Sequence, residues 1–148
     1  MELAIGLFNH TQQCAEVIDI DVSDVQEWID NMQAEYTVEC CELEGESVRI
    51  KNLGELCALV HWLEGNPHEN AAAIADFIGC FSVHDLDSYH DAATGCTDFS
   101  EYAAEYADDC LLCDIDQNHP ARNYFDYDAF ERDLQHDYIV GVFVWRNI

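Results

Sequence analysis

Hydrophobic and polar residues alternate with a period of two near the start of the chain, which is the pattern of a half-buried β-strand. One run covers residues 3–7 and a second covers residues 18–22, with the polar turn 10–13 between them. The alternating apolar residues are Leu3, Ile5, Leu7, Ile18, Ile20 and Val22. We therefore predict a β-hairpin with one face in the core and with Asp19 and Asp21 on the other face.

A helical period follows the hairpin and then gives way to strands. Residues 23–36 place apolar side chains every three or four positions, and Ser23 with Gln26 forms a capping box at their start. Residues 36–43 and 47–50 alternate again and are predicted to be strands. The first part of the chain is therefore predicted to be a small antiparallel sheet with a helix.

The middle of the chain is predicted to be helical. One helix follows Asn52, a second follows Asn66, and a shorter turn covers residues 82–89. The expected capping positions are Asn52 with Glu55, and Asn66 with Pro67 and Glu69. The core-facing residues of the first helix are Leu56, Leu59, Val60 and Leu63.

Two acidic helices are predicted in the last third. The first is capped by Asp98, and its apolar stripe is Phe99, Tyr102, Ala103, Tyr106, Ala107, Cys110 and Leu111. At about 100° per residue, one arc of roughly 100° on the other side carries Glu101, Glu105, Asp108 and Asp109. These four carboxylates would form an acidic ridge on a helix that the core holds in place.

The second acidic helix covers residues 126–137 within the aromatic segment 123–138. With Asp126 as N-cap, Phe125 and Phe130 have the spacing of a hydrophobic staple. Its inward residues are Tyr127, Phe130 and Leu134, and its water-facing acids are Asp128, Glu131 and Asp133. Arg132, the only basic residue of this helix, is expected to form a structural ion pair with a neighbouring helix.

These patterns together predict an α+β fold in three parts. Residues 1–51 form the N-terminal sheet with its helix, residues 52–90 the helical middle, and residues 91–148 the acidic C-terminal helices with a closing strand. That strand is expected over residues 138–145, interrupted at Gly141.

Charge is the extreme property of the composition. The 148 residues contain 31 acidic and 5 basic side chains, a net charge of −26, against the roughly 2 to 8 that keeps a small domain soluble. Hydrophobic residues make up 49% of the chain and aromatic residues 11%, so low hydrophobicity, the usual mark of acidic disorder, is missing. Such a charge repels nucleic acid and anionic membranes, and it attracts a protein with a basic face.

Targeting and enzyme signatures were not found. The N-terminus has no basic segment before its apolar stretch and no run of about 18 apolar residues exists, so we expect a protein of the cytoplasm with no signal peptide and no membrane span. No hydrolase, kinase or phosphate-loop pattern is present, and no cofactor is expected. We therefore expect no catalysis.

Two segments resemble metal or redox motifs. Asp114, Asp116 and Asn118 begin like a calcium loop, but His119 replaces its glycine and Phe125 its last ligand, which favours a solvated acidic loop. Cys110 and Cys113 form a lone C-x-x-C without a second ligand pair, so core cysteines are favoured over zinc ligands, and a redox dithiol stays open although no βαβ pattern surrounds it. The other cysteines are read as reduced residues, with Cys57 and Cys80 in the core.

The charge also permits an imitation of nucleic acid. Duplex DNA carries one negative charge per about 1.7 Å of its axis, so 26 charges correspond to about 44 Å, or roughly 13 base pairs. Carboxylates four residues apart on a helix are about 6 Å from one another, near the spacing of successive phosphates along a strand. A solvated acidic face would have the same spacing.

The segment from Asn123 to Tyr138 resembles the C-terminal signature of the ArdA-type antirestriction proteins. In that family an Asn-Tyr-(Ile or Phe)-Asp-Tyr segment is followed by an aromatic residue and Arg-Asp-Leu, here Asn123, Tyr124, Phe125, Asp126, Tyr127, Phe130, Arg132, Asp133 and Leu134. The acidic helix before it is also similar to the family's. The N-terminal third departs from the family's opening and would be a shortened or divergent first domain.

The resemblance implies a function without catalysis. Family members are small, acidic, elongated and commonly dimeric proteins from plasmids, transposons and phages. They imitate bent duplex DNA and occupy the DNA-binding groove of type I restriction-modification enzymes in the bacterial host cell. The residues expected to replace phosphates are Glu101, Glu105, Asp108, Asp109, Asp126, Asp128, Glu131 and Asp133.

Three other hypotheses stay open. The target could be another DNA-binding defence protein, such as a CRISPR effector, because the divergent N-terminus leaves the target range undecided. The charge could instead be a halophilic type of adaptation of a generic acidic interaction domain. An acidic metal-binding enzyme is the third.

Overall fold

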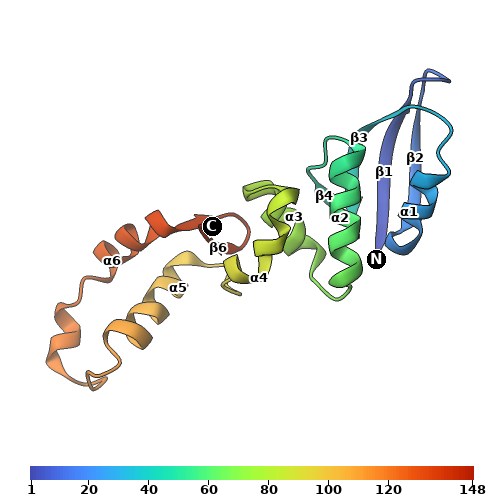
Figure 1. Cartoon of the computed structure of the whole chain (residues 1–148). Helices are drawn as coiled ribbons and strands as arrows, with labels where there is room; N and C mark the ends of the chain where they lie inside the picture. Colours follow the sequence, from blue (N-terminus) through green and yellow to red (C-terminus); the bar gives the residue numbers. More distant parts are fainter. The chain divides into compact units, whose positions relative to one another are not determined.

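The structure, a computed structural model, describes residues 1–148, and they form two compact units, Met1–Tyr89 and His90–Ile148. Both units contain helices and antiparallel strands (Figure 1), which confirms the predicted α+β class. The further division of the first unit at residue 51 stays a prediction.

The first unit is built on a four-stranded antiparallel sheet with the strand order β2-β1-β3-β4. Its strands are β1 (Glu2–Asn9), β2 (Cys14–Asp21), β3 (Tyr36–Leu43) and β4 (Glu46–Val48). β1 and β2 pair along their whole length, which confirms the predicted hairpin. Leu3, Ile5 and Leu7 of β1 are buried, and Asp19 and Asp21 on the other face of β2 are exposed.

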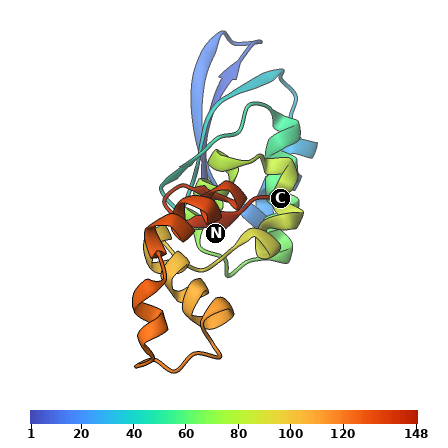
Figure 2. The same cartoon turned by 90° about the vertical axis from the view of Figure 1, so that its left-hand side faces the viewer.

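Helices cover one face of this sheet. Both α1 (Val22–Asp30) and α2 (Leu53–Gly65) lie on the same side of it (Figures 1 and 2). The four predicted core residues of α2 are all buried: Leu56, Leu59, Val60 and Leu63. α3 (Ala71–Cys80) packs beside β4, and it is followed by a 3-10 helix, η1 (Val83–Ser88). The short α4 (Tyr89–Ala92) begins at the last residue of the first unit and continues in the second.

Two predicted helix starts are wrong. α1 is capped by Asp21 and not by Ser23, because the chain passes from β2 directly into the helix and the Ser23 N–H donates to Asp21. This hydrogen bond is the largest cause that lowers the pKa of Asp21. α3 is capped by Asn70, because Asn66 is used at the end of α2, where its side chain donates to the Trp62 carbonyl at 2.8 Å. α1 also ends at Asp30, six residues before the predicted end.

At the centre of the sheet, the backbone of β1 lies close to a side chain of β3. The ladder between β1 and β3 shifts its register between Gly6 and Leu7, which marks a β-bulge. A Cβ atom at Gly6 would clash with the Sγ atom of Cys40 on β3. In the turn between β3 and β4, Glu44 and Gly45 have φ angles of 51° and 85°, the left-handed region that such a tight hairpin turn requires.

The second unit contains two helices and a small hairpin. Its elements are α5 (Phe99–Tyr106), the π-helical turn η2 (Ala107–Leu111), the 3-10 helix η3 (Pro120–Tyr124), α6 (Tyr127–Leu134), the 3-10 turn η4 (Gln135–Asp137), β5 (Tyr138–Val140) and β6 (Val144–Arg146).

The predicted single closing strand is wrong. The chain reverses after β5, where the Gly141 N–H donates to the Phe143 carbonyl, and β6 pairs back on β5. Trp145 of β6 is 2% exposed and forms a bridge with Ala93. The reversal therefore puts the largest side chain of the segment into the core of this unit.

Candidate partner-binding surface

The start of α6 has the predicted geometry. Asp126 accepts a hydrogen bond from the Ala129 N–H at 2.9 Å and is the N-cap. The rings of Phe125 and Phe130 are 5.7 Å apart, so the hydrophobic staple is confirmed. The six residues from Phe125 to Phe130 were therefore sufficient to predict where this helix begins.

α5 and α6 pack against each other in opposite directions. Ser100 near the start of α5 donates to Glu131 of α6 at 2.7 Å, and Asp108 beyond the end of α5 meets Tyr127 at the start of α6. Between these contacts the rings of Tyr106 and Phe130 are 6.3 Å apart. Aromatic side chains therefore join the two helices, and the acids lie around the joint.

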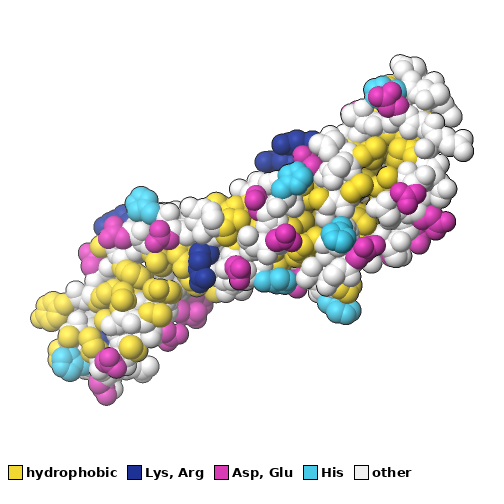
Figure 3. Space-filling model, in the orientation of Figure 1, with side chains coloured by type: hydrophobic (Ala, Val, Ile, Leu, Met, Phe, Trp, Pro, Cys, Tyr) yellow, Lys and Arg dark blue, Asp and Glu magenta, His cyan; other side chains and the backbone are white.

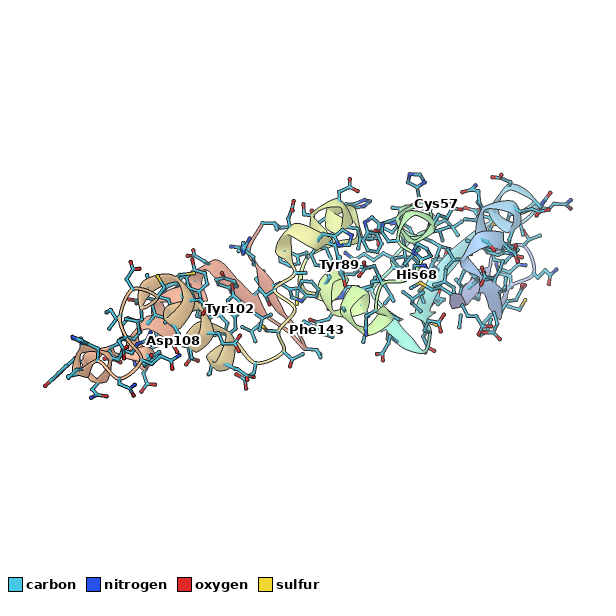
Figure 4. The ribbon with its side chains drawn as sticks, turned by 90° about the horizontal axis from the view of Figure 1, so that it is seen from below. Cys57, His68, Tyr89, Tyr102, Asp108 and Phe143 are labelled. Atoms are coloured by element: carbon cyan, nitrogen blue, oxygen red, sulfur yellow. The ribbon has the colours of Figure 1, made fainter.

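Two tyrosine side chains form a hydrogen bond between α5 and β5. The hydroxyl groups of Tyr102 on α5 and Tyr138 on β5 are 2.8 Å apart. Burial and then the hydrogen bond with Tyr138 raise the pKa of Tyr102 to about 12. Tyr102 and Asp108, at the two ends of the pair, are labelled in Figure 4.

Arg122 holds the loop between the two helices. Its Nη1 donates to Asp108 at 2.8 Å, its Nη2 to the carbonyls of Leu112 at 2.7 Å and Ile115 at 3.0 Å, and its Nε to Ile115 at 3.1 Å. The Arg122 side chain is 16% exposed. The structural ion pair expected for Arg132 belongs to Arg122 instead, because Arg132 is exposed on the outer side of α6.

The eight predicted phosphate-replacing acids differ in their surroundings. Three of them are engaged inside the unit: Asp108 by Arg122 and Tyr127, Asp126 by Ala129, and Glu131 by Ser100. The other five are exposed: Glu101, Glu105, Asp109, Asp128 and Asp133. Of these five, Glu101, Glu105 and Asp109 follow one another at intervals of four residues along α5 and η2.

The predicted apolar stripe of α5 is correct for Phe99, Tyr102, Ala103 and Ala107, which are buried or half-buried, but Tyr106 is 36% exposed. The Leu112 N–H donates to the Ala107 carbonyl five residues back, and in such a wider turn each residue advances by less than 100°. As a result Leu112 is buried at 6%, while Leu111 is 52% exposed and Cys110 is exposed. The core position predicted for Cys110 is wrong for this reason.

The remaining cysteines and the calcium-like loop show no metal geometry. All eight cysteines are free, Cys57 and Cys80 are half-buried, and burial raises the pKa of the buried Cys41 to about 12. Asp116 accepts the Asn118 N–H at 2.8 Å, which is a turn within the loop. No three His, Cys, Asp or Glu side chains are close enough to hold a metal ion.

The first unit carries an acidic surface that the sequence-based prediction of the site does not include. Residues 1–89 carry 18 acidic and two basic residues, a net charge of −16, and residues 90–148 carry 13 and three, a net charge of −10. Per residue the two units are therefore equally acidic. On the face of the sheet without helices, Asp19 and Glu42 flank Ala4 on neighbouring strands. Counting charges per predicted unit would have identified this second acidic surface.

Apolar side chains also reach the surface of the second unit. Figure 3 shows hydrophobic side chains gathered over α5 and α6, with acidic side chains at the edges of the same area. The exposed large apolar residues of this unit are Tyr106, Leu111, Tyr124, Val140, Val142 and Ile148. Tyr124 is 88% and Val142 67% exposed.

No helix of the structure has both the length and the apolar character needed to span a membrane.

Comparisons with known proteins identify one family. No curated protein and no solved structure matches the chain. The model of the family described as antirestriction protein (ArdA) matches residues 6–143. The match covers nearly the whole chain, including the sheet of the first unit, so this chain belongs to the ArdA antirestriction family, whose members are inhibitors of restriction enzymes and not enzymes themselves.

Proposed function

We propose that this chain inhibits type I restriction-modification enzymes by occupying the basic groove in which they bind duplex DNA. The family match carries the proposal, and the exposed carboxylates of the second unit support it. Inhibition of this kind requires no cofactor and no catalytic residue. It takes place in the bacterial cytoplasm, where these enzymes act.

Exposed acids on α5 and η2 are the best candidates for contact with the groove. Glu101, Glu105 and Asp109 make no ion pair, so their charges are available to a partner. Neighbours at this spacing are about 6 Å apart, near the spacing of successive phosphates. Asp128 and Asp133 of α6 add two more free carboxylates. Asp108, Asp126 and Glu131 are weaker members of the set because each is engaged inside the unit.

A competition assay with a purified type I enzyme and duplex DNA tests the proposal. We expect the chain to displace DNA at low salt, with an affinity that falls steeply as salt rises. Replacing Glu101, Glu105 and Asp109 together by lysine should abolish displacement. No displacement at low salt contradicts the proposal, and displacement of DNA from a CRISPR effector alone assigns a different target.

A matched control separates the surface from the net charge. Lysine at three exposed acids of the first unit changes the charge by the same amount: Glu27, Glu35 and Glu46. We expect this variant to retain most of the inhibition. If both triple variants lose it equally, net charge and not the α5 surface determines the effect.

We further propose that two copies of the chain associate through exposed apolar residues of the second unit. Leu111, Tyr124 and Val142 leave apolar surface that a second copy would cover. Sedimentation should show a dimer that Val142→Asp weakens. The control is Val17→Asp in the first unit, since Val17 is 73% exposed and should not affect the mass. A monomer at all concentrations refutes this part.

Equal acidity of the two units favours a second candidate, a generic halophilic type of interaction domain. Self-repulsion at a charge of −26 would then make folding depend on molar salt. Thermal unfolding in dilute buffer distinguishes the two candidates. A cooperative transition there contradicts the halophilic hypothesis.

A further inference from the structure

Two exposed thiols lie in one turn at the end of the α5–η2 helix. Of the eight free cysteines, three are exposed: Cys40, Cys110 and Cys113. Cys110 lies in the last turn of η2, and the Cys113 Sγ is 3.9 Å from the Cys110 carbonyl oxygen, to which it donates. The thiol of Cys113 therefore points back over the backbone of Cys110.

The two thiols are close enough along the chain for a disulfide to form between them. A disulfide requires Cβ atoms about 3.5–4.5 Å apart, and Cys113 lies just beyond η2, after its C-cap Leu112. The backbone of the buried Leu112 between the two cysteines is held by its N–H bond to Ala107 and by the hydrogen bond from Arg122 to its carbonyl. Because Cys113 is exposed and lies beyond the end of η2, rotation of its side chain can bring its sulfur toward Cys110.

The other pair of cysteines that are close in the sequence is not placed to form a disulfide. Cys40 and Cys41 are consecutive residues of β3, and successive side chains of a strand point to opposite faces. Cys40 is exposed and Cys41 is buried, as this geometry requires.

Carboxylates around Cys113 determine which disulfide reagent can approach. A recess of about 620 Å³ is lined by Asp108, Asp109, Cys113, Asp114, Ile115, Asp116, Gln117 and Arg122. The only cation of this recess, Arg122, is paired with Asp108. A positively charged reagent is therefore attracted to Cys113, and a negatively charged one is repelled.

We propose that Cys110 and Cys113 are a redox-active dithiol that is oxidised to an intramolecular disulfide by small disulfides, with a preference for cationic ones. The Cys113 thiolate attacks one sulfur of the reagent RSSR and releases one RS⁻, which leaves a mixed disulfide at Cys113. The Cys110 thiolate then attacks the Cys113 sulfur and releases the second RS⁻. Each released thiolate takes up one of the two thiol protons, so two RSH form and the protein loses two hydrogens. This reaction does not depend on the proposed inhibition of type I enzymes.

Incubation of the full chain with cystamine, which is cationic, and with glutathione disulfide, which is anionic, tests the proposal. We expect the peptide that contains Cys110 and Cys113 to lose two thiols and two mass units, a cross-link between residues 110 and 113 by peptide mapping, and reversal by dithiothreitol. Cystamine should react at least about tenfold faster at low salt, and the difference should shrink in high salt.

Single variants identify the two steps. Cys110→Ser should stop at a stable mixed disulfide on Cys113, and Cys113→Ser should lose the intramolecular product. Cys40→Ser, which removes the third exposed thiol, should form the same disulfide between residues 110 and 113 as the unchanged protein, without an adduct at residue 40. A stable adduct on Cys110 or Cys113 of the unchanged protein, a cross-link between chains, no loss of these two thiols, or equal rates with the two reagents at low salt would overturn the proposal.

Discussion

Removal of the Arg122 guanidinium should destabilise the second unit more than any other single loss of charge. Arg122→Ala deletes one ion pair with Asp108 and the hydrogen bonds to the Leu112 and Ile115 carbonyls. The Arg122 side chain is only 16% exposed, so its guanidinium group is mostly shielded from water. The Asp108 carboxylate keeps only the hydroxyl of Tyr127 as a partner.

The expected magnitude follows from the exposure of each partner. Asp108 has a side chain that is 47% exposed, so the ion pair contributes no more than about 1 kcal/mol. Hydrogen bonds from a charged donor contribute about 1.5–3 kcal/mol each when buried, but Ile115 lies in a partly exposed loop where water replaces part of them. We expect a total loss of about 2–3 kcal/mol. A unit of this size has a stability of roughly 3–9 kcal/mol, so the change removes a large share of it.

Hydrogen exchange is the appropriate assay because it reports on the second unit separately from the first. Peptides from residues 107–125 should exchange roughly 30- to 150-fold faster in Arg122→Ala, if exchange follows unfolding of the unit. Peptides from β1 and β2 should not change. Arg122→Lys should recover part of the effect, because an ammonium can pair with Asp108 but cannot reach two carbonyls in a fork.

Arg132→Ala is the matched control. It removes the same side chain from an exposed position ten residues away, and we expect a change below about 0.5 kcal/mol. If the two alanine variants exchange equally, the contacts of Arg122 do not stabilise the loop and the reasoning is refuted.

Three further predictions concern the centre of the sheet, the α6 cap and the buried phenol. Gly6→Ala should cost about 1–3 kcal/mol in urea unfolding, and Cys40→Ala in the same chain should restore most of it, because the clash is with the Cys40 sulfur. Asp126→Ala should cost about 1 kcal/mol and Asp126→Asn almost nothing, since an amide oxygen also caps the helix; equal losses would contradict the cap. The pKa of Tyr102 is raised from 10 to about 12, so its contribution to stability is full below pH 10 and is lost as pH rises to 12. Near-ultraviolet titration of tyrosinate should show one fewer high-pH phenol in Tyr102→Phe, and an unchanged curve would refute the assignment.

Elements that depend on local pattern could be predicted from the sequence. The first hairpin, the buried side of α2 and the cap and staple of α6 all follow from residues within a few positions of one another. Each of these signals needs only the period of the apolar residues and one capping side chain. For these elements, no contact with a distant residue was needed to decide between alternative structures.

The wrong helix starts show where local pattern is insufficient. Asp21 and Ser23 can both cap α1, and Asn66 and Asn70 can both cap α3. The choice is made by the lengths of the preceding strand and helix, which depend on pairing with distant residues. The π turn at Ala107 and the reversal at Gly141 likewise depend on which side chains, Leu112 and Trp145, the core can accept.

The candidate surface shows the same limit for charge. A carboxylate can replace a phosphate only if no group of the same protein already holds it, and this condition separates Glu105 from Asp108 although both were assigned to one ridge. The partner of Asp108 is fourteen residues away, in the short 3-10 helix η3, which is not part of the helical pattern of α5 and so could not be predicted as a contact. The sequence therefore predicts how acidic the ridge is. Which acids remain free for a basic groove depends on the few basic side chains of the protein itself. In the second unit Arg122 pairs with Asp108, so Asp108 is not free to bind a partner.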